Sequence, residues 1–501
     1  GSDDKKDKED KIGFKGMGFK SIFKFSNHVW IKSGIYSFKF DENYYKREKF
    51  PNGEKNPNFC NHSMPWQILP IWTAPLLKNL EDKEQNLIKN PVCIFIRPNG
   101  QYTLDRVKKL LDIEKMFLET FKNEDRILLF LRNVKKLEFY GKESNFTTIL
   151  NKEKWSVSKL KKLEIPTEIR ERINFQSKSD VRIPEKYGII SSTEITFATK
   201  KDNTEIQKTD DAKIFAYLPT DWNLGFDFLI NGNFIPDGSR EELFHDIEWN
   251  IYLMEEAGRL FIKWISNMVT ELGNSSPYKI LPDMNSIISQ ENDPKKNIFL
   301  EQFKVGMKNG ILETPFVLDV NNTLCLLDDI IIDRSGFSEI IGEAVFKEKF
   351  SINKNILQKD IENKSWFNNK LSGTQVEIFD WDTLKESSTE LASILRDPIT
   401  NVKFINFLIS SDKMYDFKDI AFVLTKTGEL EKPSNVYVNI KEDDLSFVSK
   451  LDVHQMNAEV KAGLSGDYES YFITYDGYQF IKEEIISKTD FVNGMLKTVE
   501  E

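Results

Sequence analysis

Residues 12–40 read IGFKGMGFKSIFKFSNHVWIKSGIYSFKF and decide how the start of the chain folds. Three closely spaced glycines followed by periodic apolar residues predict a glycine loop that opens a short helix over 19–25. Two runs with strand character flank Ser33-Gly34, which predicts a β-hairpin with strands at 29–32 and 35–40. The stretch therefore predicts a loop, a helix and a hairpin in close succession.

The glycine loop has the chemistry of an anion-binding site. Gly16 and Gly18 can adopt positive φ, which lets successive backbone N–H groups point to one spot. The helix behind them adds its unpaired N–H groups and its dipole. The spacing fits neither a Walker loop, which needs GxxxxGK[ST], nor a dinucleotide fingerprint, which follows a strand of a βαβ unit. The alternative is a tight loop–helix junction, and in both cases we expect Phe19, Phe23 and Phe25 in the core.

The remaining chain shows alternating strand and helix patterns. We expect a buried strand at 91–96, a helix at 104–122, a strand–turn–strand at 127–139, strands at 193–199, 213–218 and 226–230, a turn at Pro219-Thr220, and an amphipathic helix at 241–268. Polar stretches at 42–64 and 141–190 indicate a long loop and an insertion. Segments 315–332 and 421–438 align without a gap, which predicts one hairpin type used twice, with helices at about 384–410 between the copies.

Composition narrows the classes of function. The 501 residues include 69 Lys+Arg and 79 Asp+Glu, and the net charge of −10 argues against broad contact with DNA or RNA. The 3 cysteines and 4 histidines are scattered, which predicts neither a disulfide framework nor a zinc site and favours a cytoplasmic compartment. No stretch approaches the about 18 apolar residues of a membrane span. The charged start, Gly-Ser and not Met, does not read as a signal peptide.

Several segments in one order carry a family resemblance. Residues 12–40 resemble the ATP-lid glycine box, helix and following hairpin of the Hsp90-like branch of the gyrase, chaperone, histidine-kinase and mismatch-repair (GHKL) ATPase superfamily, in particular its sacsin and NO VEIN subgroup. Later segments that are similar to the same subgroup are QILPIW (67–72), LLFLRNV (128–134), IFAYLPT (214–220), FLINGNF (228–234), SRE (239–241) and WN (249–250). The likeness is strongest over 12–41 and 212–250 and is weak beyond 300.

The resemblance implies an α+β fold in three parts. Residues 1–100 would be the C-terminal part of a Bergerat-type α/β sandwich ATP-binding domain. Residues 101–270 would be an α/β middle (transducer) domain, and 271–501 a C-terminal region of hairpins and helices. The implied cofactors are ATP and Mg²⁺. The implied cofactor-binding residues are those of the glycine box, Gly13, Gly16, Met17, Gly18, Phe19 and Ser21.

Arg240 is the candidate catalytic residue. In the family, an arginine in the Ser-Arg-Glu loop of the middle domain reaches the γ-phosphate when the domains close, and Arg240 matches that position. A planar cation suits this task because it stabilises charge that spreads over phosphoryl oxygens. The alternative is a surface arginine at a helix start, with Ser239 as the N-cap.

The sequence departs from the family at its start. The family holds ATP with two upstream boxes, a helical Glu-x-x-x-Asn for Mg²⁺ and water and an Asp-x-Gly-x-Gly for adenine. Both are expected before residue 12, and neither is recognisable elsewhere in the chain. The chain thus carries the phosphate-facing half of the site and no metal ligand, and hydrolysis is expected only if the upstream part is supplied.

Three functional hypotheses follow. The first is a nucleotide-gated conformational switch that acts with a protein partner or as a homodimer; resemblance to bacterial members adds a role in antiviral defence. The second is a non-catalytic scaffold with a degenerate ATP site. The third is a nuclease, because Glu459-Val460-Lys461 has the ExK form with Asp452 nearby; a solvated helix face explains the same residues.

Overall fold

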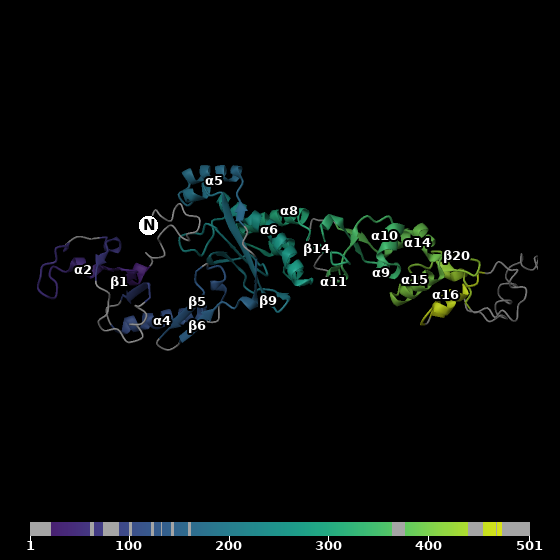
Figure 1. The fold of residues 1–501 in the computed structure, drawn as a ribbon, viewed down its shortest axis with the longest axis horizontal. Helices are drawn as coiled ribbons and strands as arrows, with labels where there is room; N and C mark the ends of the chain where they lie inside the picture. Colours follow the sequence, from purple (N-terminus) through teal and green to yellow (C-terminus); the bar gives the residue numbers. More distant parts are fainter. Residues whose placement is uncertain are drawn as a thin grey trace, which may run out of the picture. The chain divides into compact units, whose positions relative to one another are not determined.

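The structure is a computed structural model, drawn in Figure 1. It describes residues 22–60, 65–73, 90–99, 103–121, 125–131, 133–141, 145–158, 162–362, 376–438, 454–466 and 468–472. The predicted cofactor residues Gly13, Gly16, Met17, Gly18, Phe19 and Ser21 lie outside the described residues. The chain divides into two compact units, Gly1–Gly310 and Ile311–Glu501. Both units mix helices with sheets, so the protein is α+β, while the predicted domain limits stay predictions.

The predicted hairpin is present at the start of the first unit. Its strands are β1 (Ser26–Ser33) and β2 (Tyr36–Asp41), and Gly34 in the turn has a φ of 60°, which favours glycine. The edge strands β3 (Ile71–Trp72) and β4 (Val92–Pro98) complete an antiparallel sheet in the order β3-β2-β1-β4. The stretch predicted as a loop after β2 begins with helix α2 (Glu42–Lys46), because the Asp41 carboxylate caps its N-terminus.

An aromatic core packs against this sheet. The ring of Phe23 lies 5.1 Å from that of Trp66, on the turn η3 (Trp66–Ile68), and 5.6 Å from that of Phe40. The prediction that Phe25 is also in the core is wrong, because its side chain is 61% exposed. The described part of the predicted helix is a 3₁₀ turn, η2 (Ile22–Lys24), which places Phe25 on a different side from Phe23. Strand β4, predicted to be buried, is largely exposed because it pairs only with β1 among the described strands.

Helix α4 (Thr103–Phe121) confirms the helix predicted at 104–122. Of the strand–turn–strand predicted at 127–139, the first strand is wrong and the second is confirmed within a few residues. A 3₁₀ turn, η4 (Asp125–Leu128), and a loop precede strand β5 (Lys136–Tyr140), which pairs with β6 (Asn145–Ile149). The apolar run resembled a strand because Leu128 and Phe130 are buried from an irregular backbone.

The largest sheet of the first unit has seven strands. Its main order is β10-β9-β13-β11-β12, and β7 and β8 also pair with β9. Its strands are β7 (Trp155–Val157), β8 (Lys162–Glu164), β9 (Ser192–Asp202), β10 (Glu205–Gln207), β11 (Lys213–Ala216), β12 (Leu218–Asn223) and β13 (Leu229–Gly232). The turn predicted at Pro219-Thr220 lies one step earlier, at Tyr217, because Ala216 already pairs with Leu218. Pro219 is accommodated because β12 is an edge strand.

Helices pack on this sheet and on each other. Helix α6 (Glu248–Leu272) packs on the sheet through aromatic rings. The ring centroid of Phe261 on this helix lies 4.2 Å from that of Phe228, which directly precedes strand β13. Helix α6 crosses α8 (Pro294–Glu313) so closely that a methyl group on Gly258 or Gly306 would collide with backbone of the other helix. Shorter elements of this unit are η5 (Lys152–Lys154), α5 (Thr167–Ser179), η6 (Glu185–Gly188), η7 (Ser276–Ile280) and α7 (Met284–Gln290). The stretch at 141–190, predicted as an insertion, therefore contains regular structure.

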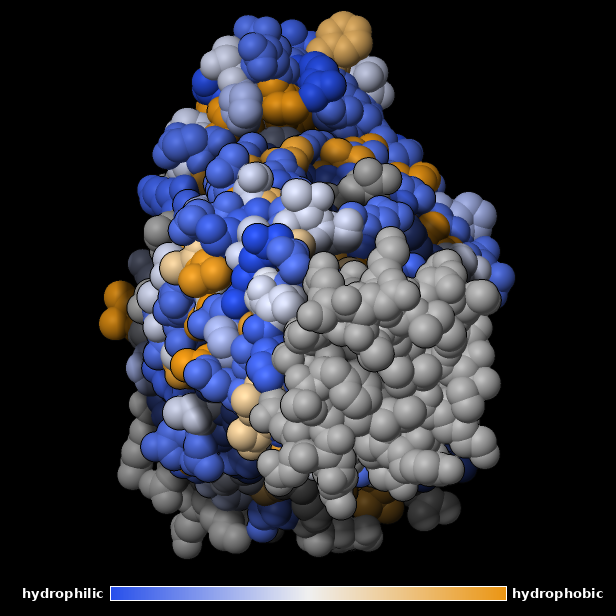
Figure 2. Space-filling view, turned by 90° about the vertical axis from the view of Figure 1, so that its right-hand side faces the viewer, coloured by the Kyte–Doolittle hydropathy of each residue, from blue (hydrophilic) through white to orange (hydrophobic). Residues whose placement is uncertain are grey.

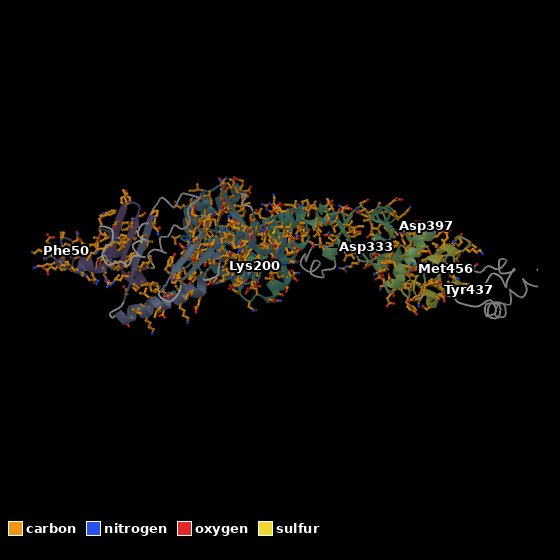
Figure 3. All side chains as sticks on the ribbon, turned by 60° about the horizontal axis from the view of Figure 1, so that its bottom comes forward. Phe50, Lys200, Asp333, Asp397, Tyr437 and Met456 are labelled. Atoms are coloured by element: carbon orange, nitrogen blue, oxygen red, sulfur yellow. The ribbon has the colours of Figure 1, made fainter. Side chains whose placement is uncertain are left out.

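The second unit contains both predicted hairpins, β14 (Val317–Leu318) with β15 (Leu324–Cys325) and β19 (Val423–Leu424) with β20 (Leu430–Glu431). A parallel sheet has the order β17-β16-β18, with Asp333 at the end of its central strand (Figure 3). The sheet strands are β16 (Ile330–Asp333), β17 (Asn355–Ile356) and β18 (Glu377–Phe379). The other elements are η8 (Leu327–Asp329), α9 (Phe337–Ile341), α10 (Glu343–Lys349), α11 (Lys359–Glu362), α13 (Trp381–Glu386), α14 (Ser388–Leu395), α15 (Pro398–Ser410), η9 (Pro433–Asn435), α16 (Ala458–Gly463) and η12 (Tyr468–Tyr471).

The surface agrees with the charged composition. The face drawn in Figure 2 is mostly hydrophilic, with hydrophobic residues in small groups between polar ones. Among the helices that the structure describes, none combines the length and the apolar character that crossing a membrane requires.

Candidate functional site

Arg240 lies in the loop that connects strand β13 to helix α6. The loop closes on itself, because Pro236 and Leu243 form an isolated β-bridge and the N–H of Asp237 donates to the carbonyl oxygen of Glu242 at 2.9 Å. It is also tied to strand β12, since the N–H of Asp221 donates to the carbonyl oxygen of Glu241 at 2.8 Å. Arg240 therefore stands at the turn of a loop that is anchored to the large sheet.

The helix predicted to begin at 241 starts instead at Glu248, because these residues form the closed loop. Its N-cap residue is Ile247. The interpretation of Arg240 as a surface residue at a helix start, with Ser239 as the N-cap, is therefore wrong.

The carboxylate of Asp237 organises the turn around Arg240. The hydroxyl group of Ser239 donates to both carboxylate oxygens, at 2.9 and 2.7 Å, and the N–H of Glu242 donates to Oδ1 at 3.4 Å. Burial raises the pKa of Asp237, but hydrogen bonds from Ser239 and from nearby backbone N–H groups outweigh this effect, so its pKa is below the usual range. The group is therefore an ionised acceptor at neutral pH.

The backbone of Arg240 is strained. Its φ of 68° is in the left-handed region, where a long side chain is uncommon, and Tyr217 has a φ of 67°. Such a conformation costs about 1–3 kcal/mol and concentrates at functional sites. Both side chains influence the hydroxyl group of Tyr187 electrostatically, so both lie in its neighbourhood. Two strained, bulky residues are thus found near one buried tyrosine of the first unit.

Buried polar side chains hold both ends of the loop. The Asn250 side chain accepts from the N–H of Ile235 at 2.8 Å and donates to the carbonyl oxygens of Ile235 and Phe244, at 2.9 and 2.8 Å. The indole N–H of Trp249 donates to the carbonyl oxygen of Asn233 at 2.8 Å. Helix α6 therefore fixes the loop through its first turn.

A second set of buried contacts supports the same region from the side of η6. The hydroxyl group of Tyr187 donates to Oδ1 of Asn233 at 3.1 Å, and its ring lies 4.8 Å from that of Trp249. Burial raises the pKa of Tyr187 well above its usual range, the neighbouring Tyr217 raises it further, and the charge of Arg240 partly opposes them. Tyr187 is thus a neutral hydrogen-bond donor.

Arg240 differs from a nearby arginine in its contacts. Arg182 donates to Asp246 at 3.1 and 2.7 Å and also to Asp180, and these hydrogen bonds raise its pKa. Within the described ranges, by contrast, the structure shows no hydrogen bond or ion pair made by the half-buried side chain of Arg240. Arg182 has a structural task, while the guanidinium group of Arg240 retains its donors for another group.

The five N–H donors of the Arg240 guanidinium fit phosphate oxygens. Within the described part of the chain, no three His, Cys, Asp or Glu side chains gather where a metal ion could be held.

The nuclease hypothesis requires Glu459 and Lys461 on a strand, and the structure places them elsewhere. Glu459 and Lys461 lie on helix α16, capped by Asn457, and not on a strand. Asp452 lies outside the described residues.

Three residues of this site, Asp237, Asn250 and Tyr187, were not predicted as functional from the sequence. The first had a local signal, because Asp-Gly-Ser is a turn sequence in which a carboxylate bonds to residues just after it. Asn250 was indicated only as part of the WN segment of the resemblance, and Tyr187 had no signal, because its partner Asn233 is distant in the chain.

Comparisons with known proteins give one distant similarity. No family model matches the sequence, and no solved structure matches it. The chain is 25% identical over 257 residues to Protein NO VEIN of Arabidopsis thaliana, a match that covers 50% of this chain and 9% of the plant protein. The chain therefore spans only a small part of the length of that relative.

Proposed function

We propose that this chain is the lid and transducer part of a nucleotide-gated conformational switch of the sacsin and NO VEIN type. In this proposal Arg240 contacts the phosphate groups of bound ATP. The observation that carries it is the conformation of Arg240, a strained residue on an anchored loop whose guanidinium group has no other hydrogen-bond partner in the described residues. The similarity to Protein NO VEIN over half of the chain supports the same interpretation.

The chemistry of Arg240 suits this task. Its planar guanidinium group donates several N–H bonds at once, and its charge opposes the negative charge of phosphoryl oxygens. The backbone N–H groups of the glycine box, from Gly13 to Ser21, would hold the phosphates on the other side. ATP, bound with Mg²⁺, supplies the phosphoryl group and its charge, and the metal ligands would come from outside the described residues.

Gating follows if Arg240 prefers the nucleotide-bound arrangement. A ligand shifts a conformational equilibrium only by its difference in affinity for the two states. A phosphate contact that Arg240 makes only when the loop approaches the nucleotide provides such a difference. The anchors of the loop, Asn250 and Asp221, would transmit the shift to helix α6 and the large sheet.

Nucleotide binding and hydrolysis by the protein as it is encoded, including any sequence before Gly1, test the proposal. We expect saturable, Mg²⁺-dependent binding of a fluorescent ATP analogue. Arg240→Ala should lower the hydrolysis rate by at least about tenfold, since removing an arginine that contacts the phosphoryl group has large effects. Arg240→Lys should retain part of the rate, because it keeps the charge and loses the planar fork.

Arg172→Ala is the matched control, because Arg172 is exposed and, among the residues that the structure describes, forms a surface ion pair with Glu248 alone. Its rate should equal that of the unmodified protein. Absence of saturable nucleotide binding would contradict the proposal and favour the non-catalytic scaffold. Equal rates for the Arg240→Ala and Arg172→Ala proteins would remove Arg240 from the mechanism.

We further propose that such a switch acts in bacterial defence with a partner protein, because the sequence resembles bacterial members of the subgroup. We expect cells that express the protein together with its partner to resist phage. The Arg240→Ala variant should lose this protection, and the Arg172→Ala variant should keep it. Equal plating of phage on cells with and without the protein would contradict this part of the proposal.

A further inference from the structure

We infer that Asp237 is a positioning residue, which holds the turn in the conformation that presents Arg240 to a phosphate group. The inference rests on the proposed function, because it assigns a cause to the geometry of the residue on which that function depends. Asp237 does not itself contact the nucleotide in this scheme. It acts through the backbone on both sides of Arg240.

The contacts of the carboxylate support this assignment. Ser239, directly before Arg240, donates its hydroxyl group to both oxygens, and Glu242, two residues after it, donates its N–H. The N–H of Glu241 in turn donates to the Ser239 hydroxyl oxygen at 3.3 Å. One carboxylate thus connects the residues that flank the left-handed position.

The strain at Arg240 explains why such an acceptor is needed. A non-glycine residue leaves the left-handed region unless its surroundings hold it there. The outer contacts of the loop, at Asp221 and Trp222, fix Glu241 and Glu242 and leave Ser239 and Arg240 to the carboxylate. Without that carboxylate we expect the turn to remain attached to the sheet and to lose its defined tip.

The test combines hydrogen exchange with ATP hydrolysis on the full encoded chain. Asp237→Ala should raise amide exchange at 238–242 by about tenfold or more and leave β13 and α6 unchanged. It should lower kcat by about tenfold, with KM within about twofold, because the contact matters for the reacting state and not for binding. Asp210→Ala is the control, because it removes an exposed carboxylate that pairs with Lys200 away from this loop.

A double-mutant cycle separates positioning from general stability. In the Arg240→Ala background, Asp237→Ala should cause no further loss of kcat, because its effect passes through the missing side chain. An additional tenfold loss in that background would overturn the inference, and so would unchanged exchange at 238–242. If Arg240→Ala has no effect on hydrolysis, the proposed function fails, and the exchange result alone then decides whether Asp237 orders the turn.

A separate set of contacts carries a second inference: the structure assigns residues 315–332 with 355–362, and residues 421–438 with 454–463, as two copies of one supersecondary module. In the first copy Val317 pairs with Cys325, and at the equivalent place in the second copy Val423 pairs with Glu431. A left-handed residue follows in each turn, Asn322 with φ 60° and Gly428 with φ 85°. The likeness of the two hairpins thus extends to their backbone geometry.

The copies remain equivalent beyond the hairpins. A 3₁₀ turn follows each hairpin, η8 in the first copy and η9 in the second. The residues after this turn form a parallel pairing with a later part of the chain, Ile331 with Ile356 in the first copy and Tyr437 with Gln455 in the second. That later segment also bridges back to the hairpin, as Leu357 with Asp319 in the first copy and Met456 with Thr425 in the second. A helix then begins directly, α11 or α16. This many shared pairings define a module larger than a hairpin.

The matching backbone hydrogen bonds show the same equivalence. In the first copy, the N–H groups of Val320, Leu357 and Gln358 donate to the carbonyl oxygens of Ile356, Ile331 and Leu318, at 2.9, 2.9 and 3.1 Å. In the second copy, the equivalent N–H groups of Lys426, Met456 and Asn457 donate to the carbonyl oxygens of Gln455, Tyr437 and Leu424, at 2.8, 3.0 and 2.9 Å. Tyr437 and Met456 are labelled in Figure 3. The second unit therefore contains a tandem repeat whose copies share a network as well as a shape.

A reciprocal exchange of the two equal-length segments 315–332 and 421–438 tests the duplication in the full chain. The exchanged protein has the same composition and length. We expect one cooperative unfolding transition of the second unit, with a Tm within about 5 °C of the unmodified protein. The control exchanges 316–333 with 421–438, a shift of one residue that turns each strand side chain to the opposite face. The control should lose the transition, and equal loss in both proteins would overturn the inference.

Discussion

The loop of Arg240 and the hairpin turns of the second unit share one backbone arrangement but carry different residues in it. In each, a polar side chain makes hydrogen bonds within the turn and a left-handed residue follows three positions later: Asp237 and Arg240, Asp319 and Asn322, Thr425 and Gly428. The two carboxylates accept these bonds, whereas the hydroxyl group of Thr425 donates to the carbonyl oxygen of Glu429 at 2.8 Å. The hairpins place asparagine or glycine at the left-handed position, the residues that tolerate it best. The loop on the large sheet places an arginine there.

This difference separates a structural turn from a turn that displays a side chain. In the two hairpins the turn only reverses the direction of the backbone, and Asn322 and Gly428 adopt the left-handed conformation with little strain. Retaining an arginine in the same conformation costs stability, and such strain is typical of binding and catalytic sites. The predictions below test this distinction through the stability of each turn.

The largest effect is expected at Asp319, which is buried and accepts from the N–H groups of Asn321 and Thr323 at 2.9 and 2.8 Å. Asp319→Ala leaves both donors without their acceptor and should destabilise the second unit by about 2–3 kcal/mol. Urea unfolding of the full chain measures this loss. Asp319→Asn, which keeps one oxygen acceptor, should cost less than half as much. Equal losses would mean that the charge, and not the acceptor, stabilises the turn.

The sequence predicted those parts of the fold that depend on local pattern. The hairpin at 26–41 has strand periodicity and a glycine in its turn, and helix α4 has a regular apolar face, so both were predicted within a few residues. The start of α6 was not, because closure of the preceding loop depends on strand β12. The exposure of Phe25 was also not predicted, because the same short run of residues can form a 3₁₀ turn or an α-helix, and the two place Phe25 on different sides.

The candidate site divides in the same way. Arg240 was found through resemblance, and no periodicity indicated it. The resemblance included Asn250 in its WN segment, but the task of Asn250 appears only when residues 235 and 244 lie beside it. The predicted binding of ATP at the glycine box stays a prediction, since those residues lie outside the described ranges.

A smaller effect is expected at Gly428, where nothing crowds the position and only the backbone matters. A Cβ atom there would meet no neighbour within 4 Å, and φ is 85°. Gly428→Ala should therefore destabilise the second unit by about 1 kcal/mol through backbone strain alone. Gly428→Asn is the control and should lose less, because asparagine tolerates the left-handed region. A neutral Gly428→Ala variant would show that the turn can relax, and the comparison with Arg240 would lose its reference.

Acid should weaken the Arg240 loop through Asp237. A carboxyl group whose pKa is lower in the folded than in the unfolded protein stabilises the fold above its unfolded pKa, near 3.9, and this contribution is lost as the pH falls below that value. We therefore expect the protection of the amides at 238–242, which is their exchange relative to the intrinsic rate at each pH, to fall below about pH 4, while the protection of helix α6 changes less. The Asp237→Asn protein should show a flatter pH profile. Identical profiles would mean that Asp237 does not control the turn.

The smallest effect has the opposite sign and completes the comparison. Arg240→Gly relieves the left-handed strain, and even after the extra entropy of glycine in the unfolded chain it should stabilise the first unit by up to about 1 kcal/mol. Asn322→Gly, at the equivalent hairpin position, should change stability by less than about 0.5 kcal/mol, because asparagine already tolerates this conformation. Urea unfolding followed by tryptophan fluorescence measures both changes. A stabilised protein that no longer responds to nucleotide would show that the arginine is retained at a cost in stability; a destabilised one would show that its side chain contributes to packing, and the strain would then be no argument for function.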